Sequence, residues 1–153
     1  MKKLLVAGLL SIGSLFAYNP LDGVKAQKEA ALKIVGNHFV DVKTAKKWMK
    51  EGVKVIDVRE IQEYMAGHIK GALLIPRGVL YGAVKKRKIT PEKKYIVVCR
   101  TGHRALLAAA TLMKWYKFEN VYVLQGGMKA WIKDGNVVIN ALNLGPVKIQ
   151  LVK

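Results

Sequence analysis

Short runs of β-branched residues alternate with segments typical of helices along the middle of this 153-residue chain. The apolar runs lie at 53–58, 72–75, 95–98 and 121–124, and the helical segments at 44–51, 60–65, 104–116 and 128–133. Runs of this length and composition are typical of buried strands. Strands that alternate with helices predict an α/β fold with a mostly parallel central sheet flanked by helices.

The first 17 residues have the pattern of a secretory signal peptide. Lys2 and Lys3 precede an apolar run over 4–17, and this run of 14 residues is shorter than a membrane-spanning helix, which needs about 20 residues. We therefore expect an exported, periplasmic protein with a cleaved signal peptide. An uncleaved inner-membrane anchor is the alternative.

Four regions follow from these patterns. The signal peptide covers 1–17, and a helical extension rich in Lys, Gln, Glu and Ala covers 18–38. The α/β domain covers 39–136, and a tail with a different character covers 137–153. Within the tail, the sequence VKIQLV resembles a strand.

The chain carries 27 Lys and Arg residues against 10 Asp and Glu residues, a formal net charge of +17. Such a charge predicts a preference for anions. The KKRK stretch at 85–88 is the best candidate for nucleic-acid binding, but no aromatic residues are interleaved with it. We therefore expect no nucleic acid as the main partner. A weak association with an anionic membrane surface is compatible with the charge.

Cys99 is the single cysteine of the chain, which excludes an intramolecular disulfide and a multi-cysteine metal site. It directly follows the predicted strand at 95–98, and ligands of parallel sheets bind at the carboxyl ends of the strands. The following residues lead into a helix, whose N-terminus presents unpaired N–H groups. Gly102 permits a tight loop, and Arg100 and Arg104 add positive charge. These features favour the thiolate over the thiol, so we predict a reactive cysteine.

Three separated segments resemble the rhodanese family of sulfurtransferases. The segment CRTGHR, from Cys99 to Arg104, is similar to the family's active-site loop. Upstream, VIDVREIQEYMAGHIKGALLIP at 55–76 resembles its other signature. Downstream, NVYVLQGGMKAWIKDG at 120–135 resembles its closing strand, glycine turn and helix. The resemblance implies a single rhodanese-like domain at 39–136.

The resemblance also implies a persulfide mechanism. Cys99 would attack the outer sulfur of a small sulfur-containing anion such as thiosulfate, and sulfite would leave. The Cys99 persulfide would then pass its sulfur to a thiophilic acceptor, which is a thiol, cyanide or an acceptor protein. The sequence contains no metal-ligand or organic-cofactor motif, so we expect neither a metal nor a cofactor.

The loop residues are expected to bind the substrate. Backbone amides would hold the persulfide, and the arginine side chains would attract the anionic donor. These residues are Arg100, Thr101, Gly102, His103 and Arg104. For His103 two possibilities stay open, because its ring could contact the anion or tune the thiolate, or could face solvent.

Asp57, Arg59 and His68 are expected to support the domain. In the family an acidic residue and an arginine stand beside the catalytic loop, and the alternative for Arg59 is a direct contact with substrate. His68 lies in the Gly-His-Ile motif and is expected to be a hydrogen-bonded structural histidine rather than an acid–base catalyst.

Two rival functions share this fold. A polysulfide-binding or sulfur-delivery protein would use the same Cys99 persulfide. The more distant alternative is a phosphatase or arsenate reductase. Four residues separate Cys99 from Arg104, as in sulfurtransferases, which is one residue fewer than in the phosphatase relatives. A smaller loop suits a single sulfur atom better than a tetrahedral phosphate.

Overall fold

The computed structural model describes residues 19–140 and 146–147 of the chain. The predicted signal peptide at 1–17 and most of the predicted tail lie outside the described residues. Within the described residues, none of the helices combines the length and the apolar character needed to cross a membrane.

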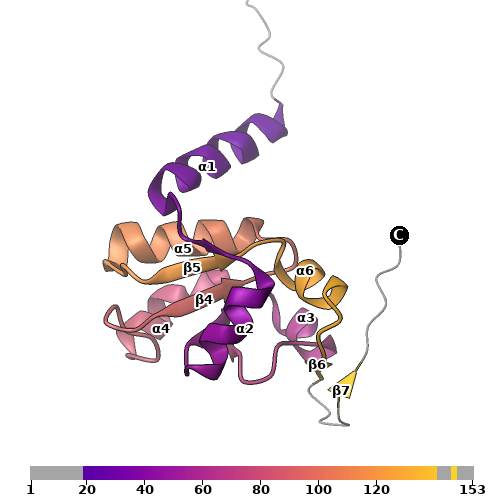
Figure 1. Ribbon diagram of the computed structural model, residues 1–153. Coiled ribbons are helices and arrows are strands. Elements are labelled where there is room, and N and C mark those ends of the chain that lie inside the picture. Colours follow the sequence, from indigo (N-terminus) through magenta and orange to yellow (C-terminus); the bar gives the residue numbers. More distant parts are fainter. Residues whose placement is uncertain (1–18, 141–145, 148–153) are drawn as a thin grey trace, which may run out of the picture.

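Five parallel strands form the central sheet, which confirms the predicted α/β fold (Figure 1). Across the sheet the order is β1 (Phe39–Val40), β5 (Val121–Leu124), β4 (Tyr95–Val98), β2 (Lys54–Asp57) and β3 (Leu73–Leu74). The middle strand, β4, is buried along its whole length. A central strand with two hydrogen-bonded neighbours is a rigid platform for the residue that follows it, and that residue is Cys99.

Helices cover both faces of the sheet (Figure 1). One face packs against α4 (Leu80–Lys85) and α5 (His103–Tyr116), and the other packs against α2 (Val42–Lys50) and α6 (Gly127–Lys133). Helix α1 (Pro20–Val35) packs against α5 (Figure 1). The short helix α3 (Ile61–Ala66) follows β2, and the 3₁₀ turn η1 (Arg77–Val79) precedes α4. After α6, β6 (Val138–Ile139) pairs in antiparallel fashion with β7 (Pro146–Val147).

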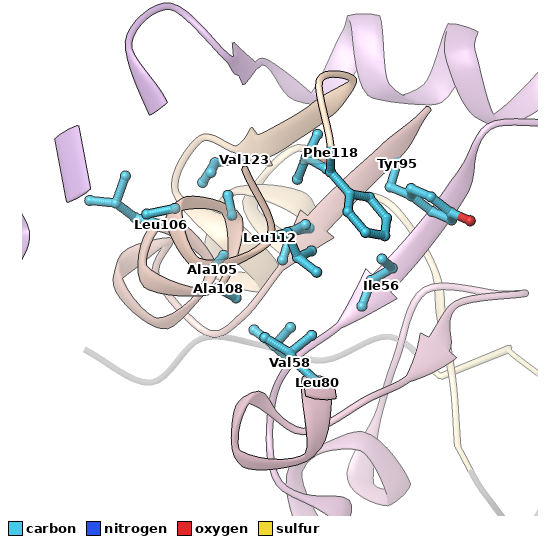
Figure 2. Packing of buried hydrophobic residues seen from close by; sticks show 14 of the residues in the cluster. Ile56, Val58, Leu80, Tyr95, Ala105, Leu106, Ala108, Leu112, Phe118 and Val123 are labelled. Carbon is cyan, nitrogen blue, oxygen red and sulfur yellow. The ribbon is translucent and has the colours of Figure 1, made fainter. Parts of the chain in front are cut away.

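The larger part of the core lies between the sheet and α5 (Figure 2). Alanines on the buried side of α5 let this helix approach the sheet closely, and larger side chains fill the space around them. Each fully buried Leu, Ile or Val contributes about 1.5–3 kcal/mol to folding. The residues seen in this packing are Ile56, Val58, Leu80, Tyr95, Ala105, Leu106, Ala108, Leu112, Phe118 and Val123.

Three details differ from the sequence-based expectations. Helix α2 begins two residues before Thr44, because the Asp41 carboxylate accepts a hydrogen bond from the Thr44 N–H at 2.7 Å and caps the helix. No helix was predicted between 65 and 104, whereas α4 forms there and ends at the first residue of the basic stretch at 85–88. Trp115 lies in the predicted helix at 104–116, and its large apolar ring favours a place in the core, but it is 68% exposed because it lies in the last turn of α5 on the side away from the sheet.

Candidate active site

Cys99 lies at the carboxyl end of β4 and is 1% exposed. The backbone N–H of Gly102 donates to its Sγ at 3.1 Å, and the N–H of Ala105 donates at 3.4 Å. Gly102 caps α5 and Ala105 lies in its first turn, where a helix leaves N–H groups without partners of its own. The junction of β4 and α5 therefore gives the sulfur two backbone donors, which stabilise negative charge on it.

The start of helix α6, directly after the glycine turn at 126–127, holds the predicted catalytic loop at 99–104 in place. The N–H of Met128 donates to the carbonyl oxygen of Cys99 at 2.8 Å, and the next N–H of α6 donates to the next loop carbonyl at 3.1 Å. Gly127 has a φ of +58°, and a Cβ at this position would overlap the Cys99 carbonyl oxygen. The position therefore requires glycine both for its backbone conformation and for the close approach of the loop.

Arg104 forms a two-fold hydrogen-bonded ion pair with Glu63 of α3. Its Nη1 and Nη2 donate to the two carboxylate oxygens at 2.6 and 2.7 Å. These hydrogen bonds hold the pKa of Glu63 below its ordinary value, although partial burial acts in the opposite direction. The same contact raises the pKa of Arg104, and negative charge at Cys99 adds to that effect. The predicted substrate-binding residue Arg104 therefore also ties the catalytic loop to α3.

Asp57 and Arg59 form a buried ion pair at the carboxyl end of β2. Nε of Arg59 donates to the two Asp57 oxygens at 2.9 and 3.0 Å. Nη1 donates to the carbonyl oxygen of Glu63 at 3.1 Å, and Nη2 to that of Gly67 at 2.8 Å. Every nitrogen of the guanidinium is thus engaged within the domain, where it joins β2 to the middle of α3 and to its C-terminal end.

His68 lies against Tyr64 of α3. The two rings stack with centroids 3.6 Å apart and planes 11° from parallel. Nδ1 of His68 lies 2.9 Å from the carbonyl oxygen of Tyr64, and since a carbonyl only accepts, Nδ1 carries the proton. The backbone of His68 also exchanges two hydrogen bonds with Ile139, each of 2.9 Å. These contacts attach the segment before β3 to α3 and to β6.

The remaining predicted loop residues differ in exposure. Arg100 and Thr101 are exposed, whereas His103, the first residue of α5, is half-buried. Nε2 of His103 is buried without a hydrogen-bond partner among the described residues.

The sequence did not single out Glu63 or the glycine pair at 126–127 as parts of this site. The opposite charges of Glu63 and Arg104 were the one available signal for their pairing.

In the described part of the chain, no group of three or more His, Cys, Asp or Glu side chains could hold a metal ion. The groups that contact Sγ of Cys99 are backbone N–H groups, from Gly102 and Ala105. A buried cysteine held by amides at a strand–helix junction of a parallel sheet defines a class of cysteine-dependent group-transfer domains. Within that class, residues 41–134 match the rhodanese-like domain family. The chain therefore belongs to the rhodanese-like domain family.

Known relatives point to the same chemistry. The probable adenylyltransferase/sulfurtransferase MoeZ of Mycobacterium tuberculosis is 32% identical over 125 residues, which cover 80% of this chain but 31% of MoeZ. The thiosulfate sulfurtransferase GlpE of Pseudomonas entomophila is 35% identical over 81 residues, which cover 53% of this chain and 72% of GlpE. The match thus spans about a third of MoeZ and most of GlpE.

A solved structure is similar over most of both chains. The polysulfide-sulfur transferase homodimer of Wolinella succinogenes is 31% identical, with a TM-score of 0.60, and the similarity covers 78% of this chain and 85% of that protein. The family and these relatives together support sulfur transfer as the general chemistry of the chain.

Proposed function

We propose that this protein is a thiosulfate sulfurtransferase-like enzyme that moves a sulfane sulfur through a persulfide on Cys99. The observation that supports this function most directly is the pair of N–H groups, from Gly102 and Ala105, that face Sγ at 3.1 and 3.4 Å. Amides fixed in this way stabilise a negatively charged sulfur without reorganising during the reaction.

The reaction divides into two displacements. In the first, the Cys99 thiolate attacks the outer sulfur of thiosulfate, the sulfur–sulfur bond of the donor breaks, and its electron pair leaves with sulfite. In the second, a nucleophilic acceptor attacks the terminal sulfur of the persulfide, and the Sγ–S bond breaks to regenerate the Cys99 thiolate. Each displacement forms one bond and breaks one bond, so no external oxidant or reductant is consumed.

The arginines of the loop have different roles in this proposal. Arg100 is exposed, so its guanidinium is free to approach an anionic donor from solvent. Arg104 is held by Glu63, so it positions the start of α5 and adds positive charge near Sγ. Asp57, Arg59 and His68 support the loop through α3 rather than by touching the substrate.

Steady-state kinetics with thiosulfate and cyanide test this function. Because the two substrates react in separate displacements, double-reciprocal plots at several fixed cyanide concentrations should give parallel lines. Cys99→Ser should abolish turnover, and Lys114→Gln, a change at an exposed residue in the last turn of α5, is the control that should keep it. Intersecting lines, or turnover by Cys99→Ser, would contradict the proposal.

The second candidate is a polysulfide-binding or sulfur-delivery protein that uses the same persulfide. The similarity to the polysulfide-sulfur transferase, at 31% identity over 78% of this chain, favours it. The two functions differ in the preferred donor. A rate of persulfide formation that is higher with polysulfide than with thiosulfate would favour sulfur delivery, and the reverse order would favour the thiosulfate enzyme.

We further propose that the protein is exported to the periplasm. This proposal is supported by the sequence pattern at 1–17, in which two lysines precede a short apolar run. The mass of the mature protein from the producing cell tests it. Loss of the first 17 or so residues is expected, and retention of Met1 would indicate an uncleaved anchor instead.

A further inference from the structure

A cleft of about 610 Å³ opens between the catalytic loop and helix α1. One side is formed by loop residues 101–103 and by Gln125 and Gly126 after β5, and the opposite side by Lys28 and Leu32 of α1. Helix α1 lies outside residues 41–134, which match the family. The extension before the domain therefore completes a cavity beside the active-site loop.

Helix α1 is held in this position by packing against α5. Ala31 and Val35 are buried in the same core cluster as the buried face of α5, and Figure 1 shows α1 lying along that side of the molecule. The Asn19 side chain caps the first turn, and the N–H of Gly36 closes the last turn on the carbonyl oxygen of Leu32 at 2.9 Å. The wall that carries Lys28 is thus a capped helix anchored at its C-terminal half.

The cleft combines an apolar floor with one cationic side chain. Leu106 and Val123, which lie close together in Figure 2, form part of this floor. Leu32 remains 39% exposed, so its apolar surface faces the opening. Among the described residues that line the cleft, Lys28 carries a full charge, none is acidic, and Gln125 adds a side-chain amide.

The size of the cleft matches an organic molecule rather than a small inorganic ion. Ligand pockets of about 300–1,000 Å³ hold molecules of drug-like size, and an apolar lining with a few polar groups sets their orientation. The cleft also adjoins the catalytic loop, because it is lined by Gly102, the residue whose N–H donates to Sγ of Cys99.

We propose that this cleft binds the sulfur acceptor, and that the acceptor is an organic thiol with an apolar chain and a carboxylate that pairs with Lys28. This inference rests on the proposed function, because it assigns the acceptor of that reaction. The acceptor thiolate attacks the terminal sulfur of the Cys99 persulfide, the Sγ–S bond breaks, and the products are an organic persulfide and the Cys99 thiolate.

The kinetic test compares two thiols that differ only in their distal group, mercaptohexanoate and mercaptohexanol. Lys28→Gln should raise the ratio of the KM for the acid to the KM for the alcohol about threefold, a size typical of one exposed ion pair. Lys25→Gln is the matched control, because Lys25 is an exposed lysine of the same helix that does not line the cleft. An unchanged ratio in Lys28→Gln, or an equal change in Lys25→Gln, would overturn the inference.

A binding test separates this inference from the proposed function. Hexanoate, which cannot accept sulfur, is titrated into the Cys99→Ser variant and followed by backbone amide NMR shifts. Saturable shifts of residues 28, 32 and 101–103 are expected, together with weaker binding after Lys28→Gln. Such binding would support the cleft even if no sulfur transfer occurred. Shifts confined to other lysine-rich surfaces, or no shifts, would refute it even if transfer from Cys99 were demonstrated.

Discussion

Asp57 and Arg59 form a buried ion pair, with exposed fractions of 0% and 6%. The stability of the fold should therefore depend strongly on each of these two side chains. Replacing Asp57 by Ala leaves a buried guanidinium without its counter-charge. Breaking a buried ion pair in this way costs about 3–5 kcal/mol. We therefore expect Asp57→Ala to lower the free energy of unfolding by about that amount, measured by urea denaturation.

The exposed pair between Lys46 and Asp134 provides the matched control for Asp57→Ala. Its atoms lie 4.0 Å apart and both side chains are about half exposed. Pairs of this kind contribute about 0–1 kcal/mol, so Asp134→Ala should change the free energy of unfolding by no more than that. Equal losses of unfolding free energy in the two variants would show that the buried Asp57 pair stabilises the fold no more than an exposed pair does.

The pair of Glu63 and Arg104 should make stability depend on pH. Because the Arg104 hydrogen bonds lower the pKa of Glu63 in the folded protein, the folded state favours the ionised carboxylate. The stabilisation is fully present above the ordinary glutamate pKa of 4.5 and is lost as the pH falls below it, through the lower folded value. At neutral pH, Glu63→Gln should lower the free energy of unfolding by about 0.2–1 kcal/mol, since the pair is about one-third exposed.

The measurement is the difference in unfolding free energy between the wild type and Glu63→Gln, taken from neutral pH into the acid range. We expect this difference to shrink as the pH falls below 4.5. Glu119→Gln is a suitable comparison, because Glu119 is exposed and makes no ion pair with the catalytic loop or with any other described residue. A difference that grew toward low pH would contradict the assigned direction of the Glu63 pKa.

The start of α6 and the catalytic loop form one unit at the scale of secondary-structure elements, and Gly127 is the contact between them. Gly127→Ala places a Cβ against the Cys99 carbonyl oxygen and keeps a φ of +58°. We expect a loss of at least about 3 kcal/mol in the free energy of unfolding, from backbone strain together with overpacking. The catalytic loop would have to move to avoid the overlap, and this movement should also slow persulfide formation at Cys99.

Gly135→Ala separates backbone strain from overlap. Gly135 also has a positive φ, of +77°, but a Cβ there would meet no atom within 4 Å. This variant should therefore lose only about 1–2 kcal/mol and should keep its rate of persulfide formation. If Gly127→Ala and Gly135→Ala behaved alike in stopped-flow and unfolding measurements, the close contact between α6 and the loop would have no functional importance.

The strands were predictable because their signal is local. The β-branched runs that became β2, β4 and β5 are buried on both sides, and such strands read as continuous apolar segments. Helix α4 was missed, because a six-residue helix with Gly82 in its interior has weak intrinsic propensity and forms through tertiary packing of Leu80 and Ala83. The start of α2 was predicted two residues too late because Asp41 and Thr44 are both good N-cap residues.

The site was predictable in part. Cys99 and its loop stand out in the sequence because the strand, the glycine and the arginines follow one another directly. The pairing of Arg104 with Glu63 joins residues 41 positions apart, so no local pattern specifies it. The position of α1 beside the loop could not be predicted either, because it depends on how Ala31 and Val35 pack against α5.

The whole molecule carries a large excess of positive charge, 27 Lys and Arg residues against 10 Asp and Glu residues. Juxtamembrane basic residues contribute about 1 kcal/mol each near an anionic surface. We expect the protein without residues 1–17 to sediment with vesicles containing anionic lipid and to be released as salt shortens the Debye length. Binding to vesicles of neutral lipid, or binding that is insensitive to salt, would contradict this electrostatic origin.

The account depends above all on a sulfur atom carried by Cys99. Intact-mass spectrometry after incubation with thiosulfate and rapid desalting tests this most directly. The wild-type protein should gain about 32 Da, one sulfur atom attached to a reactive thiolate, and cyanide should remove the added mass. Cys99→Ser should gain nothing under the same conditions. An adduct that persists in Cys99→Ser, or a wild type that gains no mass from either thiosulfate or polysulfide, would contradict the central claim.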